Sequence, residues 1–483
     1  MKRIAVNAIV LCALTLNVSA QTDDKTLSNY DKFRKEMLAD YEGFHRGILD
    51  DYDKFLDEVW KEYEHFLGEK RDQRPKPQAQ PQKQPSEKPT DPVRQTPDVP
   101  QPVPTPSTPP TTPPTPTPIP PAIEYQRFSF YGVSVQVPKV DYSPLTSLSI
   151  YNFGEGWRTL KQLEVEKQVL PALQQTSTAC NLNDWFFFEL CQTYADAMLT
   201  NGTPASRLLL THYLMTHQGY DVRLGRTTEV PFLLLPMNQM VYARSYLNIN
   251  SGRYHIFTDR LSGQTIVGKQ SYYSCNIPTD VDAGRKLDLI VRPLNMPERK
   301  HAFSISYSGL TLKGEVNATL MDMVRHYPQM PVPDYARSTL SPSLRRSIVS
   351  QMKTQLSGSQ GLTAINRLLR FVQKGFDYAT DDDFHGYEKP YFFEETLYYP
   401  KCDCEDRSVF FAYLVKEVLD VNNCLIHYPG HECTAIIRSD LSGDGFLLNN
   451  TSYFITDPTY MGADAGMCMP QFKNETPRVE FWY

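Results

Sequence analysis

The stretch that decides the fold of the C-terminal region reads KCDCEDRSVFFAYLV over residues 401–415. Apolar residues after Cys404 recur with helical spacing, and the acidic pair Glu405 and Asp406 suits a first helical turn because carboxylates there complement the helix dipole. The sequence therefore predicts a helix that begins at Cys404. At such a position the dipole favours the thiolate over the thiol, as a nucleophilic cysteine requires.

Two later stretches carry the groups that a thiol nucleophile needs. Residues 424–437 read CLIHYPGHECTAII, which predicts a strand, a Pro-Gly turn and a second strand that begins at His431. Residues 453–459 read YFITDPT and predict a strand that ends at Asp457. A cysteine at a helix start, a histidine on one strand and an aspartate after the next supply a nucleophile, a general base and the group that orients the base.

The region from about residue 362 to 460 resembles the transglutaminase-like superfamily of papain-like thiol enzymes. In that family a helix precedes the nucleophile. The stretch AINRLLRFVQ at 364–373, followed by FDY at 376–378, is similar to that helix, and FEETL at 393–397 leads into the cysteine motif. The chain is also similar to exported Bacteroidetes proteins that carry a Cys-Glu-Asp-Arg-Ser motif.

The resemblance implies an α+β fold with a papain-like domain over residues 340–483, in which Cys404 is the nucleophile, His431 the general base and Asp457 its partner. It implies thiol acyl transfer, in which the cysteine attacks an amide carbonyl and the histidine takes up and returns the proton. The acyl group then passes to water or to an amine. The chain departs from the family at residues 402–403, which replace the glycine usual before the motif and affect the local turn.

The expected function is that of an exported cysteine peptidase, amidase or transglutaminase acting on peptide or protein amides. The alternative is a non-catalytic cell-envelope scaffold or binding protein built on the same fold. The backbone N–H of Cys404 is the expected oxyanion donor, and Tyr398 or Tyr399 is a candidate second donor. No cofactor and no metal is expected, because the cysteines near the motif lack the paired C-x-x-C units of a zinc site.

The remaining cysteines allow several disulfides. Cys402 could pair with Cys424 or Cys433 and thereby pin the site, whereas a bond from Cys402 to the nucleophile would be strained and would block it. A local disulfide is open to Cys180 and Cys191, which are equally compatible with core positions.

The N-terminus is typical of an export signal. Lys2 and Arg3 precede an apolar run over residues 4–16, and small residues at 18–20 suit signal peptidase, so residues 1–20 are predicted to be a signal peptide. The apolar run is too short to span a membrane, and no later run reaches the roughly 18 apolar residues of a transmembrane helix. The mature chain is therefore expected in the periplasm, in the cell envelope or outside the cell, where disulfides can form.

Residues 22–72 repeat with a period of 11, with tyrosines at 30, 41, 52 and 63 and phenylalanines at 33, 44, 55 and 66. This period predicts a coiled-coil-like amphipathic helix with one aromatic face. The segment holds 15 Asp and Glu against 9 Lys and Arg, so its other face is acidic. The aromatic face predicts self-association or docking on another surface, and packing on the protein's own body is the alternative.

Residues 73–123 hold 19 of the 38 prolines and almost no aliphatic residues. Such a segment cannot bury a core and stays extended, which predicts a disordered spacer. The whole chain of 483 residues has a net charge of −6. A nucleic-acid partner is not expected, because binding phosphates needs a basic face.

Residues 126–325 are expected to form an α+β middle domain. At an offset of 200 residues, RLLLTHYL at 207–214 shares Arg, Tyr and Leu with the helix after the nucleophile, and YHIFTD at 254–259 parallels the strand before the orienting aspartate. Pro204 and Pro231 stand where the nucleophile and base would be. The pattern predicts a degenerate second copy without a nucleophile, and an unrelated α+β domain is the alternative.

Beyond this part, apolar and polar residues alternate over 286–291, 301–307 and 310–316. Alternation with a period of two is typical of strands that are buried on one face. The sequence therefore predicts a small β-sheet unit at the end of the middle domain.

Overall fold

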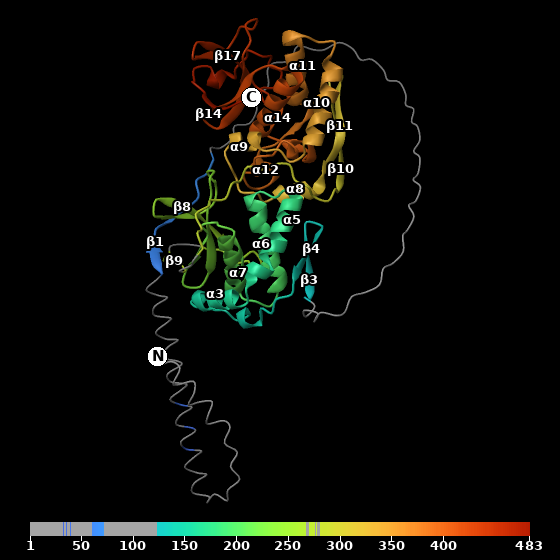
Figure 1. The fold of residues 1–483 in the computed structure, drawn as a ribbon. Helices are drawn as coiled ribbons and strands as arrows, with labels where there is room; N and C mark the ends of the chain where they lie inside the picture. The colour runs from blue at the N-terminus through green and yellow to red at the C-terminus, as the bar shows by residue number, and fades with distance from the viewer. Residues whose placement is uncertain are drawn as a thin grey trace, which may run out of the picture. The chain divides into compact units, whose positions relative to one another are not determined.

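The computed structural model describes residues 60–71, 123–266, 270–275, 277 and 281–483, together with positions 32, 35 and 39. The predicted signal peptide at 1–20 and residues 73–122 of the predicted linker lie outside this part of the chain. Residues 61–483 form one compact unit (Figure 1). Among the helices of the described residues, none is long and apolar enough to cross a membrane.

The last part of the predicted repeat helix consists of strands. β1 (Lys61–Tyr63) and β2 (His65–Phe66) are the two edges of a seven-stranded antiparallel sheet with the order β1-β9-β5-β6-β8-β7-β2. The ring of His65 stacks on Tyr272 of β9 with centroids 4.2 Å apart, and Phe66 stacks on Tyr246 of β7 at 5.2 Å. Over residues 61–66, backbone pairing and aromatic contacts across the sheet therefore decide the structure, although the sequence has a helical period.

The helix prediction for residues 22–72 is therefore wrong over residues 61–66. Positions 32, 35 and 39 are helical, as predicted, and the other residues before position 60 lie outside the described part. The aromatic residues at the end of the repeat pack on the protein's own body, which was the alternative to docking for this part of the segment.

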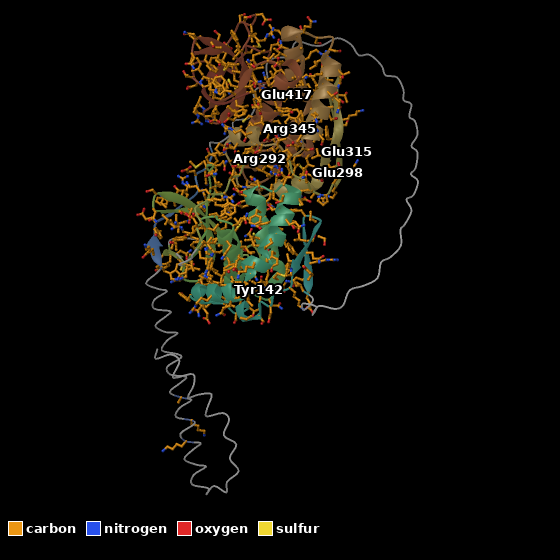
Figure 2. All side chains as sticks on the ribbon, in the orientation of Figure 1. Tyr142, Arg292, Glu298, Glu315, Arg345 and Glu417 are labelled. Atoms are coloured by element: carbon orange, nitrogen blue, oxygen red, sulfur yellow. The ribbon has the colours of Figure 1, made fainter. Side chains whose placement is uncertain are left out.

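The middle domain begins with a hairpin of β3 (Tyr125–Phe130) and β4 (Val133–Pro138). A short 3-10 helix and five α-helices follow: η1 (Ser143–Leu145), α3 (Phe153–Gln162), α4 (Val165–Gln168), α5 (Leu170–Cys180), α6 (Asp184–Met198) and α7 (Pro204–His217). Residues 205–216 of α7 are all buried, so this helix is the centre of the domain. Tyr142, labelled in Figure 2, shares a hydrogen bond of 2.7 Å with Tyr194 of α6 in this core.

The strands of the middle sheet follow α7: β5 (Arg223–Arg226), β6 (Pro231–Pro236), β7 (Tyr246–Ile249), β8 (Gly252–Thr258) and β9 (Tyr272–Cys275). Every residue of β6 is buried, because α7 packs on this strand. The uninterrupted apolar run of β6 is what a strand covered on both faces requires.

The predicted β-sheet unit is a single hairpin of β10 (Lys300–Tyr307) and β11 (Leu310–Asn317). The third predicted strand, at 286–291, makes isolated bridges from Arg285 and Leu287. Three helices come next: α8 (Ala318–Val324), α9 (Val332–Arg337) and α10 (Pro342–Leu356). The hairpin packs on α10 and α11, so it belongs to the C-terminal helices rather than to the middle sheet.

The C-terminal domain places its helices before its sheet: α11 (Gly361–Gly375), β12 (Asp377–Tyr378), α12 (Asp381–Phe384), α13 (Glu395–Tyr398), β13 (Lys401–Cys402) and α14 (Cys404–Leu419). The sheet strands are β14 (Asn423–Tyr428), β15 (His431–Ile436), β16 (Gly445–Leu448), β17 (Thr451–Thr456) and β18 (Arg478–Trp482), with η2 (Pro470–Phe472) before the last. α14 packs on α10, α11 and β15 (Figure 1). The chain therefore has the predicted α+β class.

The two larger sheets share one strand order. Five strands of the middle sheet follow the order β9-β5-β6-β8-β7, and the C-terminal sheet follows β18-β14-β15-β17-β16, antiparallel throughout. In each case the preceding helix packs on the third strand of this order, α7 on β6 and α14 on β15. The correspondence is therefore of elements and their order, not only of short sequence matches.

Candidate active site

Cys404 is the first residue of α14, as the sequence predicts. Asp406, in the first turn, accepts hydrogen bonds from the backbone N–H groups of Asp403 at 3.2 Å and Tyr391 at 2.8 Å. These bonds tie the loop before the helix to its first turn. The thiol is fixed at the helix start and has no exposed surface.

Ser408 joins the first turn of α14 to the strand that carries the predicted base. Its hydroxyl lies 2.7 Å from the carbonyl oxygen of Cys404 and 3.1 Å from that of Glu432, the second residue of β15. The buried thiol of Cys433 has a pKa raised by burial, by the charge of Asp457 and, to a smaller extent, by Cys404. The nucleophile, β15 and the predicted aspartate therefore lie together in one buried region.

His431 begins β15, and its Nε2 lies 2.8 Å from Oδ2 of Asp457. Both side chains are buried, and the imidazole stacks on Phe472 of η2 with an interplanar angle of 3°. The other carboxylate oxygen of Asp457 accepts backbone N–H bonds from Thr459 at 2.7 Å and Tyr460 at 3.2 Å. The structure thus brings together the two residues predicted as base and orienting acid and leaves Nδ1 as the other ring nitrogen, while their catalytic roles stay a prediction.

Gln373 of α11 is a positioning residue that the sequence analysis missed. Its fully buried amide donates to the carbonyl oxygens of Asp457 at 3.1 Å and Tyr460 at 2.8 Å, and its Oε1 accepts from the N–H of Gly462 at 3.1 Å. The amide thus holds the turn that follows β17. A polar side chain on the buried face of an amphipathic helix was the signal that could have identified it.

A cluster of buried carboxyl groups surrounds the nucleophile. The thiol of Cys404 donates to Oε2 of Glu405 at 3.2 Å. Burial, and then the neighbouring carboxylates, raise the pKa of Asp403 and Asp406 well above the usual range and that of Asp381 to about 10. These carboxyl groups therefore hold their protons more strongly than usual at the same helix start whose dipole would favour a thiolate.

Tyr378 is the tyrosine nearest to the motif in this arrangement. β12 pairs in parallel with β13, so Tyr378 lies opposite Cys402, and the guanidinium of Arg407 lies 5.2 Å from the tyrosine ring. Burial raises the pKa of Tyr378, and the charges of Cys404 and its acidic neighbours add to this effect. Sequence comparison placed this residue in the family pattern without giving it a role.

The two tyrosines predicted as oxyanion donors, Tyr398 and Tyr399, pack against other aromatic rings. The ring of Tyr398, at the end of α13, lies 4.6 Å from His301 of β10, and that of Tyr399 lies 5.0 Å from both His385 and Tyr391. Burial raises the pKa of Tyr399. Their role in stabilising an oxyanion stays a prediction.

All eight described cysteines are buried and none of them is in a disulfide, so none of the bonds considered for Cys402 or for the pair at 180 and 191 is formed. Burial raises the pKa of Cys402 to about 11 and that of Cys424 to about 12. The sheet directs Cys424 at the carbonyl oxygen of Ala435, at 3.7 Å, rather than at another sulfur. These thiols are therefore structural core residues at neutral pH.

Several side-chain groups in the described residues are close enough to share a metal ion. They are Asp381–Asp403–Asp406, Asp381–Glu388–Glu405, Asp403–Cys404–Glu405, His431–Cys433–Asp457 and His427–Glu432–Glu480. The first three are rich in carboxylate oxygens, which suit hard cations, and none has the four sulfur and nitrogen ligands of structural zinc. These three groups lie around the helix start at Cys404, His431–Cys433–Asp457 contains the predicted base and acid, and His427–Glu432–Glu480 joins β14, β15 and β18.

The middle domain has other residues at the positions equivalent to Cys404 and His431, and an aspartate at the position equivalent to Asp457. Pro204 begins α7, Pro231 begins β6, and Asp259 follows β8 directly. Arg207 donates two hydrogen bonds to Asp259, at 2.9 and 2.7 Å. The acid is conserved in position between the two units, but here it forms a buried ion pair.

Comparisons with known proteins give no assignment for the C-terminal site. The chain matches no family model. It also matches no curated protein and no solved structure. The chemistry of the C-terminal site is therefore argued from the residues that the fold brings together: Cys404, His431, Asp457 and their buried neighbours.

Proposed function

We propose that the C-terminal domain is a transglutaminase-like thiol enzyme that transfers the acyl group of a peptide or protein amide. The observation that carries this proposal is the buried pair of His431 and Asp457, 2.8 Å apart, beside the helix that begins at Cys404. A buried histidine and aspartate bonded in this way hold the imidazole in one orientation. We further propose that the chain is exported and that residues 22–60 dock on a partner or a second copy.

The reaction has two steps. The sulfur of Cys404, its proton taken up by His431, attacks the amide carbon, and a carbon–sulfur bond forms while the carbonyl π electrons move to oxygen. Collapse of this oxyanion breaks the carbon–nitrogen bond, and the leaving amine takes the proton from His431. Water or an amine, deprotonated by the same imidazole, then attacks the thioester and releases the acid or the new amide and the thiol.

The oxyanion needs hydrogen-bond donors at the nucleophile. In this proposal the backbone N–H of Cys404 donates to the oxyanion, since the first N–H groups of a helix have no acceptor within the helix. The helix dipole adds positive potential at the same point.

The middle domain is, in this proposal, a degenerate copy of the C-terminal unit. Its support is the shared strand order, the helix on the third strand, and an aspartate directly after the fourth. With Pro204 and Pro231 in place of nucleophile and base, it would serve as a structural or binding partner of the active copy.

The test is alkylation of the full-length protein with iodoacetamide, followed site by site by mass spectrometry. We expect Cys404 to react fastest, because the helix dipole favours its thiolate, whereas burial raises the pKa of the thiols of Cys424, Cys433 and Cys468. Cys404→Ala should abolish amide turnover, whereas Cys468→Ala, a buried thiol outside the triad, should retain it. Equal labelling of all cysteines, or turnover by Cys404→Ala, would contradict the proposal.

The burial of the whole triad favours a second candidate, a non-catalytic scaffold. Cys404 has no exposed surface, and His431 and Asp457 are 1% and 2% exposed. A scaffold predicts that Cys404→Ala leaves the biological role intact while deletion of residues 22–60 removes it. A latent enzyme predicts the reverse for the cysteine variant.

A further inference from the structure

The segment after β2 crosses from the middle sheet to the nucleophile. The carbonyl oxygen of Glu69 accepts the backbone N–H of Ala243 at 2.6 Å, and its side chain forms an ion pair with Arg253 at 3.0 Å. A Cβ added at Gly68 would lie 2.1 Å from the backbone nitrogen of Arg244, so only glycine permits this close approach. The segment is therefore held closely against the middle domain up to position 69.

Arg71 continues this segment into the carboxyl cluster. Its side chain is 9% exposed, and its Nη1 lies 3.7 Å from Oε1 of Glu388 and 4.0 Å from Oε1 of Glu405. Glu405 is the residue whose other oxygen accepts the thiol hydrogen of Cys404. A guanidinium thus lies one side chain away from the nucleophile, in a site with no exposed sulfur.

Arg71 lies further from its carboxylate partners than Arg345, another buried arginine of the same molecule, lies from its own. Among the described residues, its Nη1 has no hydrogen-bond acceptor. Arg345, labelled in Figure 2, lies 3.0 Å from Glu394 and 2.8 Å from the carbonyl oxygen of Ser338. A buried guanidinium nitrogen without a close acceptor costs free energy, so the contact of Arg71 is easier to exchange for another cation.

The cluster that faces Arg71 has more acids than cations. Carboxyl oxygens of Asp381, Glu388 and Glu405 lie within 4.8 Å of one another. The nearest lysine, Lys389, is engaged by Glu395 at 2.5 Å. Asp381 has its pKa raised to about 10 by burial and neighbouring carboxylates, which is the response of a site that lacks positive charge.

Two cavities adjoin the contact and meet at Tyr242, whose ring lies 5.5 Å from the guanidinium of Arg71. One, of about 170 Å³, is lined by Glu388, Lys389 and the middle-domain residues around Tyr242. The other, of about 200 Å³, is lined by Arg71, His427 and Glu432, the last of which follows the predicted base on β15. An extended chain lying along both cavities would pass over the position that Arg71 now fills.

We propose that Asp381, Glu388 and Glu405 form a substrate subsite for a guanidinium or ammonium side chain beside the attacked amide, and that Arg71 occupies it as an internal pseudosubstrate. This inference rests on the proposed acyl-transfer function and names its substrate class: peptides with a basic residue near the attacked bond. Movement of residues 70–71 away from the cluster empties the subsite, and a basic side chain of the substrate takes the place of Arg71.

Binding is tested with the full chain and two small probes, N-acetylarginine amide and its neutral isostere N-acetylcitrulline amide, by calorimetry. We expect Arg71→Gln to bind the arginine probe at least about tenfold more tightly than wild type and than it binds the citrulline probe, because a desolvated charge pair discriminates strongly. Adding Glu388→Gln should remove this preference. Arg127→Gln, an exposed arginine on β3, is the charge-matched control and should behave as wild type.

Reactivity separates the subsite from the chemistry. Peptidyl chloromethyl ketones ending in arginine or citrulline should alkylate Cys404 faster in Arg71→Gln than in wild type, with the arginine reagent preferred at least about tenfold. Arg253→Gln, which loosens the segment outside the subsite, should act in the same direction, and it serves if Arg71→Gln does not fold.

Equal binding of the arginine and citrulline probes by Arg71→Gln would overturn the proposed subsite. Binding of Ca²⁺ to Arg71→Gln without any preference for the arginine probe would also overturn it, since the cluster would then be a metal site. Discrimination between the probes without alkylation of Cys404 in any variant would leave the cationic subsite standing and overturn the acyl-transfer function.

Discussion

Pro204 and Cys404 occupy the same place in two units that share a strand order: each begins the helix that packs on the sheet. The residue before each is the N-cap, a threonine at 203 and an aspartate at 403. In the middle domain the helix start is uncharged, whereas in the C-terminal domain it is surrounded by buried acids. The same backbone frame thus carries either an ordinary helix start or a charged site.

The aspartate after the fourth strand shows the same contrast. Asp259 is bonded to Arg207, while Asp457 is bonded to His431. Arg407, at the place of Arg207, donates instead to backbone carbonyl groups of residues 373 and 376, at 3.3 and 2.8 Å. The acid at this position is therefore the ion-pair partner of an arginine in the middle domain and the hydrogen-bond partner of a histidine in the C-terminal domain.

The largest effect is expected from Asp457→Asn. The amide cannot hold the imidazole in the reactive orientation and cannot stabilise its positive charge, so amide turnover should fall by about 10²- to 10⁴-fold while the fold is retained. Steady-state kinetics and circular dichroism check this. Turnover within twofold of wild type would show that the pair is structural, as it is in the middle domain.

The matching change in the middle domain, Asp259→Ala, should act on stability instead. It leaves the buried guanidinium of Arg207 without its carboxylate, which costs about 3 kcal/mol of the free energy of unfolding. Urea unfolding measures the loss, and thiol reactivity of Cys404 in the folded variant should be unchanged. A stable Asp259→Ala protein would mean that the ion pair contributes little.

A smaller, pH-dependent effect is expected from Glu189 on α6 of the middle domain. Burial raises its pKa to about 7, so the folded state holds a proton that the unfolded state releases above about pH 4.5. Stability should therefore fall as the pH rises from 5 to 7, by at most about 1.4 kcal/mol per pH unit. Urea unfolding of wild type and Glu189→Gln at both pH values checks this, and an equal slope in the variant would contradict it.

The smallest effect is expected at Thr203, the uncharged N-cap of α7. The Thr203 hydroxyl oxygen accepts the backbone N–H of Ser206 at 3.2 Å, so Thr203→Ala should cost about 1 kcal/mol and leave turnover unchanged. Thr203→Ser is the matched control, since it keeps the accepting oxygen. A loss of activity in Thr203→Ala would mean that the middle domain takes part in the chemistry.

Local patterns in the sequence predict much of the C-terminal unit. The helical spacing after Cys404, the Pro-Gly turn before His431 and the strand before Asp457 each depend on neighbours a few residues away. For this reason their start and end points agree with the structure. The copy relation is visible for the same reason, as short segments with the same spacing.

Contacts between distant residues could not be predicted in this way. The strands at 61–66 form by pairing with strands that lie about 180 to 210 residues further along the chain, so no local pattern announces them. Gln373 reaches the turn after Asp457 only because α11 packs beside it. Cys424 forms no disulfide because the sheet directs its thiol at the carbonyl oxygen of Ala435, a residue on the neighbouring strand.

Short-range spacing in the sequence was enough to single out Cys404, His431 and Asp457, in that order, as the candidate nucleophile, base and acid. The tertiary structure alone decided their surroundings: the buried acids around Cys404, the closed site, and the guanidinium of Arg71 beside Glu405. The physical reason is that desolvation and charge pairing depend on which groups are neighbours in space. That neighbourhood is set by residues far apart in the chain.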